Sequence, residues 1–241
     1  MNENILTLAG VQTHIGAYHI LHGVDLDIPR GQLTMLLGRN GAGKTTTLRT
    51  IMGLWRASQG TITFNGNDIT KLSTPQIASM NVAYVPENMG IVAELTVKEN
   101  MLLAARWAKN AGQIDSQRLQ WIFSLFPAVE KFWNHPAGKL SGGQKQMLAV
   151  ARAIVEPRDL LIIDEPSKGL APAIINNMID AFAQLKQSGV SILLVEQNIN
   201  FAKRLGDTVA VMDNGRVVHS GAMKELAENE ELQHSLLGLA I

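Results

Sequence analysis

The feature that most constrains the fold of this chain is a glycine-rich segment between a strand-like run and a helix-like run. Residues 38–45 read GRNGAGKT, which matches the phosphate-loop pattern of glycine, any four residues, glycine, lysine and serine or threonine. The apolar run Leu33–Leu37 before it has the length of a buried strand. A helix from about Gly43 to Met52 is expected after it, with Gly53 closing its end. A strand, a glycine loop and a helix in this order predict an α/β fold that binds phosphate.

The residues of this phosphate loop are expected to play separate roles. Its glycines allow backbone N–H groups to turn inward around a phosphate, and the helix N-terminus adds a favourable dipole. Lys44 is expected to reach the β- and γ-phosphates of a nucleotide, and Thr45 to place its hydroxyl on Mg²⁺. The alternative is a structural turn with an incidental lysine, which the flanking strand and helix argue against.

Two carboxylates follow a second buried run. Leu160–Ile163 is apolar throughout and leads into Asp164 and Glu165. Ligands of open α/β sheets bind at the carboxyl ends of the strands, so these acids are expected beside the phosphate loop. Asp164 would hold Mg²⁺, directly or through water, and Glu165 would orient or deprotonate the water that attacks the γ-phosphate. Without the loop, the same pair would be two solvated acids at a strand end.

A second anion-binding helix end is predicted at residues 140–144, which read LSGGQ. A serine hydroxyl, two glycines that permit close backbone approach and a helix N-terminus together suit a phosphate. One nucleotide does not need two such helix ends in one chain, so this one is expected to act on a nucleotide held by another chain. For the pentapeptide alone, a helix N-cap without a ligand is the alternative.

The motifs lie in one domain with a helical insertion. Before about residue 88, strand signals alternate with turn signals, including an Asn-Gly pair at 65–66 that indicates a hairpin. Residues 88–156 carry helix signals, among them the capping boxes that begin at Thr96 and Ser141. Buried-type strands then alternate with helices, with a crossover helix over Pro172–Gln187. This pattern predicts an α/β core with a β-rich N-terminal part and an inserted helical subdomain.

Composition narrows the class of protein. Lys plus Arg and Asp plus Glu both number 21, so the formal net charge is +0, which argues against a nucleic-acid-binding protein. With 0 cysteines, a disulfide framework and a thiolate nucleophile are excluded. No apolar run approaches the roughly 18 residues of a membrane span, and the N-terminus lacks the pattern of a signal peptide. We expect a cytoplasmic chain whose membrane role, if any, comes through a partner.

The three motifs, in this order, resemble the ATPase subunit of ATP-binding cassette (ABC) transporters. The LSGGQ signature is highly specific for that superfamily, and the resemblance covers essentially residues 1–241. It implies a P-loop NTPase fold with a RecA-like core, ATP and Mg²⁺ as cofactors, and ATP hydrolysis that drives transport. It also implies that two cassettes, identical or different, sandwich two ATPs head to tail.

The resemblance implies further partners and a location. Membrane permease subunits would dock near Glu87 and the helical insertion, and would place the chain peripherally on the inner face of the cell membrane. A periplasmic or extracellular substrate-binding protein would act indirectly, and no nucleic acid is expected. Trp107, Trp121 and Trp133 in the insertion are candidates for the groove that receives a permease helix, or for the core.

A narrower resemblance concerns stretches outside the three motifs. YVPE at 84–87, LTVKEN at 95–100, EPSKGLAP at 165–172 and LVEQN at 194–198 resemble importers of branched-chain amino acids. This implies a subunit that powers import of branched-chain or other hydrophobic amino acids. Importers of urea and short amides have similar stretches, so the substrate stays open. A soluble cassette protein acting on ribosomes or DNA is disfavoured by the charge balance.

Several positions depart from the general cassette pattern. Glu87 stands where most cassettes have glutamine; a carboxylate can still ligate Mg²⁺ but adds negative charge near a triphosphate. Gln197 stands where most have the switch histidine, and it can hydrogen-bond a γ-phosphate oxygen but cannot carry charge. Ala171 replaces an aspartate, and Ile15 replaces the aromatic residue that stacks on adenine, with Tyr18 nearby as a substitute. A weakly catalytic or regulatory nucleotide-binding subunit is therefore the second hypothesis.

The candidate site residues fall into three groups. Glu165 and Gln197 are assigned to catalysis, and Thr45, Asp164 and Glu87 to Mg²⁺. The nucleotide is assigned to residues of the phosphate loop and of the signature: Gly38, Asn40, Gly41, Ala42, Gly43, Lys44, Thr45 and Thr46, with Ser141, Gly142, Gly143 and Gln144.

Overall fold

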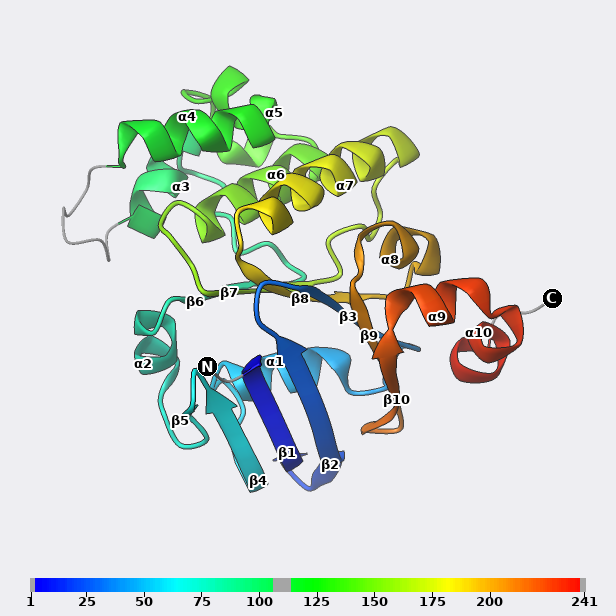
Figure 1. Cartoon of the computed structure of the whole chain (residues 1–241). Helices are drawn as coiled ribbons and strands as arrows, with labels where there is room; N and C mark the ends of the chain where they lie inside the picture. The colour runs from blue at the N-terminus through cyan, green and yellow to red at the C-terminus, as the bar shows by residue number, and fades with distance from the viewer. Residues whose placement is uncertain (1–2, 106–113, 239–241) are drawn as a thin grey trace.

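The computed structural model describes residues 3–105 and 114–238 of the chain. Among these residues the strands form a six-stranded and a four-stranded sheet (Figure 1). Helices α3 to α7 lie above the six-stranded sheet in this view, and the four-stranded sheet lies below it. The predicted α/β architecture is confirmed.

The six-stranded sheet is the core of the fold and runs in the order β10-β9-β3-β8-β7-β6. Its pairs are parallel except for the antiparallel hairpin of β9 and β10. Strands β3, β7 and β8 are buried at every position, as expected for a parallel sheet covered on both faces. The strands are β3 Leu33–Gly38, β6 Val82–Val85, β7 Leu160–Asp164, β8 Ser191–Glu196, β9 Thr208–Asp213 and β10 Arg216–Ala222.

The four-stranded sheet is antiparallel and carries the N-terminal hairpin. Its order is β2-β1-β4-β5, with β1 Asn4–Ile15, β2 Tyr18–Pro29, β4 Ala57–Phe64 and β5 Asn67–Asp68. The register of β1 against β2 shifts between Leu8 and Val11, where Gly10 adopts a φ of +59°. A glycine in the left-handed region is typical of such a bulge.

The helices cover the two faces of the six-stranded sheet separately. Met35 and Leu37 of β3 belong to a hydrophobic cluster with residues of α6 and α7. Leu36 belongs to a second cluster with α1 and the four-stranded sheet. Helices α1 and α6 therefore pack on opposite faces. The helices are α1 Lys44–Ile51, α2 Thr74–Ser79, α3 Val97–Ala104, α4 Ser116–Leu125, α5 Pro127–Lys131, α6 Gly142–Ala153, α7 Pro172–Gln187, α8 Ile199–Leu205, α9 Met223–Glu228 and α10 Glu230–Leu237.

The helix signals of residues 88–156 are confirmed, because α3 to α6 fall between β6 and β7. Both predicted capping boxes form, at Thr96 before α3 and at Ser141 before α6. The continuation of α3 through Trp107 lies outside the described residues. Within the described parts of the chain, no helix has the length and apolar character needed to cross a membrane.

Candidate nucleotide site

The carboxyl ends of three neighbouring strands bring the predicted site together. Leu37 of β3 lies beside Glu196 of β8, and Asp164 of β7 lies beside Val195 of β8. The phosphate loop after β3 therefore lies near Asp164 at the end of β7, near Glu165 directly after it, and near the loop that follows β8. This convergence is the one that the strand-end argument predicted.

The phosphate loop leaves the N-terminus of α1 without a side-chain cap. Gly43 is the N-cap residue with a φ of +103°, a conformation that favours glycine. Because glycine has no side chain, no side-chain hydrogen bond caps this helix. Gly38 has no room for a side chain, because a Cβ there would lie 2.4 Å from the carbonyl oxygen of Met212. Asn40 and Gly41 are exposed at the tip of the loop. The uncapped N–H groups are thus available to an anion.

Lys44 is held inside the loop. Its side chain is 4% exposed, and Nζ donates to the carbonyl oxygens of Gly38 at 2.9 Å and Arg39 at 3.0 Å. Burial lowers the pKa of Lys44, while the neighbouring Glu165 carboxylate, 3.7 Å from Nζ, acts in the opposite direction. A buried ammonium beside an uncapped helix end is a strong electrostatic site for a phosphate.

Asp164 and Thr45 offer oxygens suited to Mg²⁺. The Thr45 hydroxyl donates to Oδ1 of Asp164 at 3.2 Å. Oδ2 of Asp164 is buried and has no hydrogen-bond partner among the described residues. Burial raises the pKa of Asp164 to about 6, and the nearby Glu165 and Glu87 carboxylates add to this. A buried carboxylate with a free oxygen next to a hydroxyl fits a hard divalent cation.

Glu165 lies next to Lys44 and Gln197. Oε1 of Glu165 accepts a hydrogen bond from Nε2 of Gln197 at 2.6 Å, and the Glu165 side chain is 9% exposed. Glu165 has a φ of +47°, a left-handed conformation that costs a non-glycine residue about 1–3 kcal/mol. Such strain at a chemically important residue indicates that its position is imposed by the surroundings.

Glu196 is a site residue that sequence reasoning missed. Its side chain is almost fully buried, and its carboxylate accepts backbone hydrogen bonds from Ser167, Gln197 and Asn198. Burial raises its pKa, and the hydrogen bond from Ser167 acts in the opposite direction. Glu196 therefore ties the loop after Glu165 to the loop that carries Gln197. Its position at the end of a buried strand run, as for Asp164 after Leu160–Ile163, was a signal available in the sequence.

The signature segment forms the second glycine-rich helix end, but its chemistry differs from that of the phosphate loop. The Ser141 hydroxyl accepts from the Gln144 N–H at 3.3 Å, and the Gln144 side chain accepts from the Ser141 N–H at 2.9 Å. Gly142 has open space where a Cβ would lie. A Cβ on Gly143 would lie 2.6 Å from Cγ2 of Ile174 in α7. Gly142 keeps an open face, whereas Gly143 is required by the packing of α6 on α7.

The hairpin of β1 and β2 carries Ile15 and Tyr18, the two positions considered for contact with the adenine base of ATP. Tyr18 is 76% exposed at the end of this hairpin. Three histidines of the same hairpin contact one another: the ring centroids of His14 and His19 are 4.1 Å apart, and those of His19 and His22 are 4.1 Å apart. Among residues 3–105 and 114–238, no group of three or more His, Cys, Asp or Glu side chains is arranged to hold a metal ion. His14, Tyr18 and His19 are exposed, and His22 is half-buried.

Glu87 is paired with a lysine that the sequence did not single out. Its Oε1 accepts from Nζ of Lys168 at 2.6 Å. The negative charge of Glu87 still contributes to the raised pKa of Asp164, so the two carboxylates share one electrostatic neighbourhood. Thr46 lies in the first turn of α1.

Comparisons with known proteins agree with this geometry. The family model described as ABC transporter matches residues 21–168. The chain is 36% identical over 235 residues to the high-affinity branched-chain amino acid transport ATP-binding protein BraG of Pseudomonas aeruginosa, covering 97% of this chain and 100% of the relative. It is also 36% identical over 222 residues to the probable branched-chain amino acid transport ATP-binding protein LivF of Archaeoglobus fulgidus, covering 92% and 93%.

A solved structure has the same fold. It is described as the structure of an ATP-binding subunit of an ABC transporter, and it superposes with a TM-score of 0.82 at 29% identity, over 95% of this chain and 94% of that chain. Together with the site geometry and the family match, this likeness shows that the chain belongs to the ABC transporter family as an ATP-binding, ATP-hydrolysing subunit.

Proposed function

We propose that this chain is the ATPase subunit of an ABC importer for branched-chain or other hydrophobic amino acids. The observation that carries the proposal is the convergence of Lys44, Asp164 and Glu165 at the carboxyl edge of the sheet, in a chain 36% identical to two branched-chain amino acid transport proteins. Importers of urea or short amides are the alternative substrate class.

The residues divide the hydrolysis of ATP among them. Lys44 and the uncapped N-terminus of α1 would bind the β- and γ-phosphates. Thr45 and Asp164 would hold Mg²⁺, which neutralises charge on the phosphate oxygens when bound. Glu165 would orient the attacking water and accept its proton, with Gln197 positioning the carboxylate.

The signature segment would complete the site of a second cassette. Helices α1 and α6 pack on opposite faces of the six-stranded sheet, so their N-termini do not serve one nucleotide of the same chain. Ser141 and Gly142 are exposed, and Gly142 has open space around it. Two cassettes arranged head to tail would bring the phosphate loop of one to the signature of the other. The second cassette is this chain or a different one.

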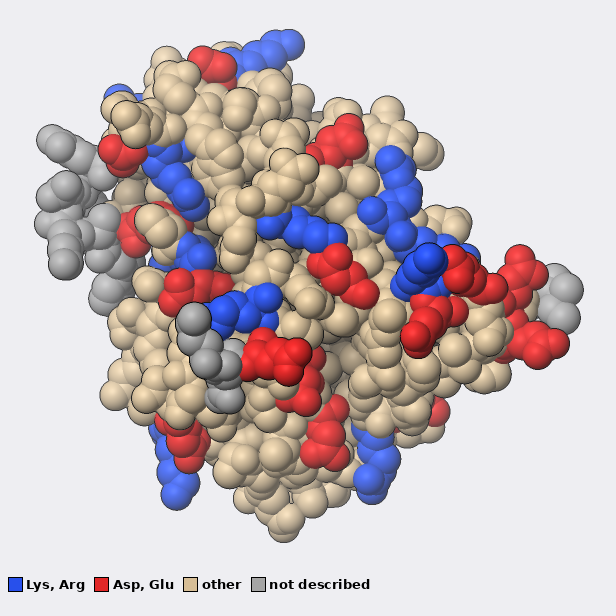
Figure 2. Space-filling model, in the orientation of Figure 1, with Lys and Arg blue, Asp and Glu red and all other residues tan. Residues whose placement is uncertain are grey.

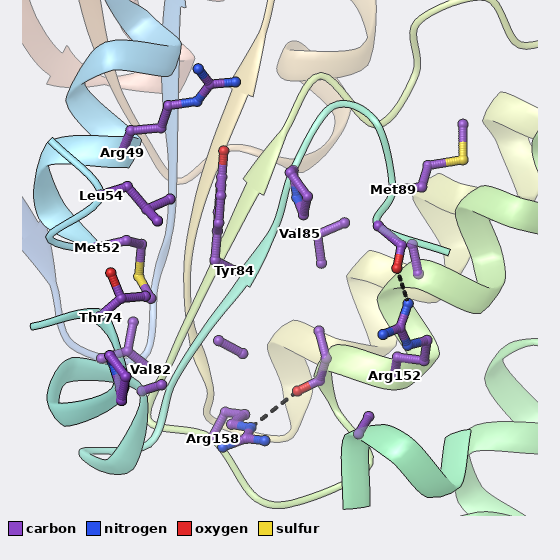
Figure 3. A pocket seen from close by; sticks show the side chains of 18 of the residues that line it. Arg49, Met52, Leu54, Thr74, Val82, Tyr84, Val85, Met89, Arg152 and Arg158 are labelled. Carbon is purple, nitrogen blue, oxygen red and sulfur yellow. Dashed lines mark hydrogen bonds between the residues drawn. The ribbon is translucent and has the colours of Figure 1, made fainter. Parts of the chain in front are cut away.

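A hollow between the core and the helical insertion would receive the permease. It has a volume of about 890 Å³, and Leu54, Tyr84 and Met89 are among the residues that line it (Figure 3). The half-buried Arg152 in its wall donates one guanidinium N–H to the carbonyl oxygen of Gly90, and its Nε has no hydrogen-bond partner among the described residues. A largely apolar hollow with one unpaired guanidinium N–H in its wall suits a short helix that carries an acidic residue.

Trp107, Trp121 and Trp133 were candidates for this groove or for the core. Trp55, which follows α1, lines the hollow. Trp133 instead packs edge-to-face on Phe123 at 5.2 Å, and Trp121 lies under the guanidinium of Arg118 at 4.2 Å. Trp107 lies outside the described residues.

The surface charge agrees with docking on protein rather than on nucleic acid. Figure 2 shows acidic and basic side chains interspersed on the face in view. The formal net charge of +0 favours neither nucleic acid nor a strongly acidic partner. Docking on permease subunits would hold the chain on the inner face of the cell membrane, and a substrate-binding protein would act from the opposite side.

Co-purification tests this proposal. The tagged chain is isolated from its native membranes in mild detergent, and the accompanying proteins are identified by mass spectrometry. We expect two multi-span membrane subunits and a second cassette chain. The complex is then reconstituted with the substrate-binding protein, and ATP turnover is measured with leucine, with urea and with neither.

The co-purified proteins and the ATP turnover distinguish the amino-acid importer, the urea or short-amide importer and a regulatory ATPase. Stimulation by leucine supports the amino-acid importer, and stimulation by urea alone supports the alternative substrate class. Recovery of soluble partners only, in repeated preparations, would contradict the importer and favour a regulatory ATPase.

A further inference from the structure

Lys168 connects two carboxylates that are far apart in the sequence. It lies on the loop after β7, and its Nζ is 2.6 Å from Oε1 of Glu87 and 3.4 Å from Oε2 of Glu165. Glu87 belongs to the segment after β6, and Glu165 is the proposed catalytic base. One ammonium group therefore touches both segments.

The Glu165 carboxylate is occupied on both oxygens in this structure. Oε1 accepts from Gln197 and lies 3.7 Å from Nζ of Lys44, while Oε2 faces Lys168. A general base needs an oxygen within hydrogen-bond reach of the water it activates. If a phosphate draws Lys44 away, Lys168 remains as a cation that competes for the same carboxylate.

The other end of this contact lies at the hollow proposed for the permease. Glu87 follows Pro86 and precedes Asn88, and both of these neighbours line the hollow. A partner seated there would act on the backbone that carries Glu87. Any movement of Glu87 would change how Lys168 divides its contact between the two carboxylates.

The strength of the contact suits a reversible role. The side chains of Lys168 and Glu87 are 57% and 46% exposed. Exposed ion pairs are weak and are easily broken by competing interactions. Hydrogen bonding to Glu87, with the charge of Glu165, raises the pKa of Lys168, which therefore stays charged at neutral pH.

We propose that Lys168 is a positioning residue that restrains the Glu165 carboxylate in the resting subunit and links it, through Glu87, to the permease-facing segment. The inference rests on the proposed function and deepens it by naming a residue through which docking regulates turnover. It also gives Glu87 a role other than that of a Mg²⁺ ligand, because Lys168 compensates its negative charge.

Steady-state ATP hydrolysis by the purified full-length chain tests this role through Lys168→Gln. We expect kcat to rise about two- to fivefold, the range that corresponds to one exposed ion pair. KM for ATP is expected to stay unchanged, because Lys168 does not touch the phosphate loop. Lys224→Gln is the matched control, because Lys224 is an exposed lysine in an ion pair with Glu228 on α9. It is expected to leave both constants unchanged.

A second variant gives a change of opposite sign. Glu87→Gln removes the competing partner of Lys168, which then lies on Glu165 alone, so kcat is expected to fall. The double variant Glu87→Gln with Lys168→Gln is expected to return to the level of Lys168→Gln. In the complex purified from membranes, Lys168→Gln is expected to lower the ratio of substrate-stimulated to basal turnover by the same two- to fivefold factor.

Three results would overturn the inference. An unchanged or lowered kcat in Lys168→Gln contradicts a restraining role. A double variant as slow as Glu87→Gln alone shows that Glu87 acts without Lys168, as a Mg²⁺ ligand would. A wild-type chain and complex without ATP turnover would overturn the proposed function itself, and this inference with it.

Discussion

The chain contains two glycine-rich helix N-termini, and they are built in opposite ways. The N-terminus of α1 has no side-chain cap, and Lys44 beside it is buried. The N-terminus of α6 is closed by the capping box of Ser141 and Gln144, yet its first residue, Gly142, is exposed. Both resemble anion sites in sequence, but only the first has the acids and lysine of a complete half-site around it.

The difference shows how one chain can carry two halves of a shared site. The α1 end is incomplete as a helix terminus and would be completed by a nucleotide of its own chain. The α6 end is stable without any ligand, because its capping box satisfies part of the helix terminus. It is therefore free to present an open surface to a nucleotide held elsewhere.

The largest effect is expected at the α1 end. Lys44→Ala removes the buried ammonium that faces the phosphates, so turnover is expected to fall by about 10²–10³, the cost of one well-placed transition-state donor. Binding of a fluorescent ATP analogue is expected to weaken as well. Retention of wild-type turnover would show that the phosphate loop is not the site of hydrolysis.

The next largest effect is expected from Gly142→Asp at the α6 end. The side chain meets open space, and an acidic residue in the first turn favours the helix, so the free energy of unfolding is expected to stay equal or rise slightly. Turnover is expected to fall by about 10², because a carboxylate occupies the place of a phosphate. Thermal unfolding and ATP hydrolysis are measured on the same preparation. Full activity would contradict a role for α6 in the shared site.

Gly143→Ala sharpens the contrast within the same helix end. Its Cβ would lie 2.6 Å from Cγ2 of Ile174, so the packing of α6 on α7 must shift. We expect the free energy of unfolding to fall by about 1–3 kcal/mol, as is typical of overpacking. Urea titration checks this value. A wild-type midpoint would mean that Ile174 moves aside without cost.

The smallest effect is expected from a change at Tyr18, the candidate for stacking on the adenine base of ATP. Tyr18→Ala removes an exposed ring, and affinity for ATP is expected to weaken by about 1 kcal/mol, near the lower limit for stacking of a base on an aromatic side chain. Equilibrium titration with an ATP analogue measures the change, and GTP serves as the comparison. An unchanged Kd would leave the base without an aromatic partner at Tyr18.

The parts of the fold that were predicted from the sequence are those whose cause is local. The phosphate loop, the capping boxes at Thr96 and Ser141, and the buried run before Asp164 each depend on a few adjacent residues. Strand β1 was not predicted, because Gly10 and the change of register interrupt its alternation. The short helices α9 and α10 carry weak periodicity and were also not predicted.

The parts of the site that were not predicted depend on tertiary contact. Glu87 and Lys168 are 81 positions apart and meet only because β6 pairs with β7. Glu196 and Ser167 are 29 positions apart and meet because β7 pairs with β8. No local pattern reports such pairs, whereas Asp164 and Glu165 were predicted because they directly follow the apolar run Leu160–Ile163.

The central claim is that α1 of one cassette and α6 of another share one ATP. Light scattering of the Glu165→Gln variant, purified with the cassette chain that accompanies it, tests this claim most directly. With ATP and Mg²⁺, we expect slow hydrolysis and the mass of a two-cassette complex. The same sample with Gly142→Asp, and with the same change at the matching signature glycine if the second cassette is a different chain, is expected to keep the mass of single chains. A mass that does not depend on ATP, or a complex that forms equally well with Gly142→Asp, would contradict the shared site.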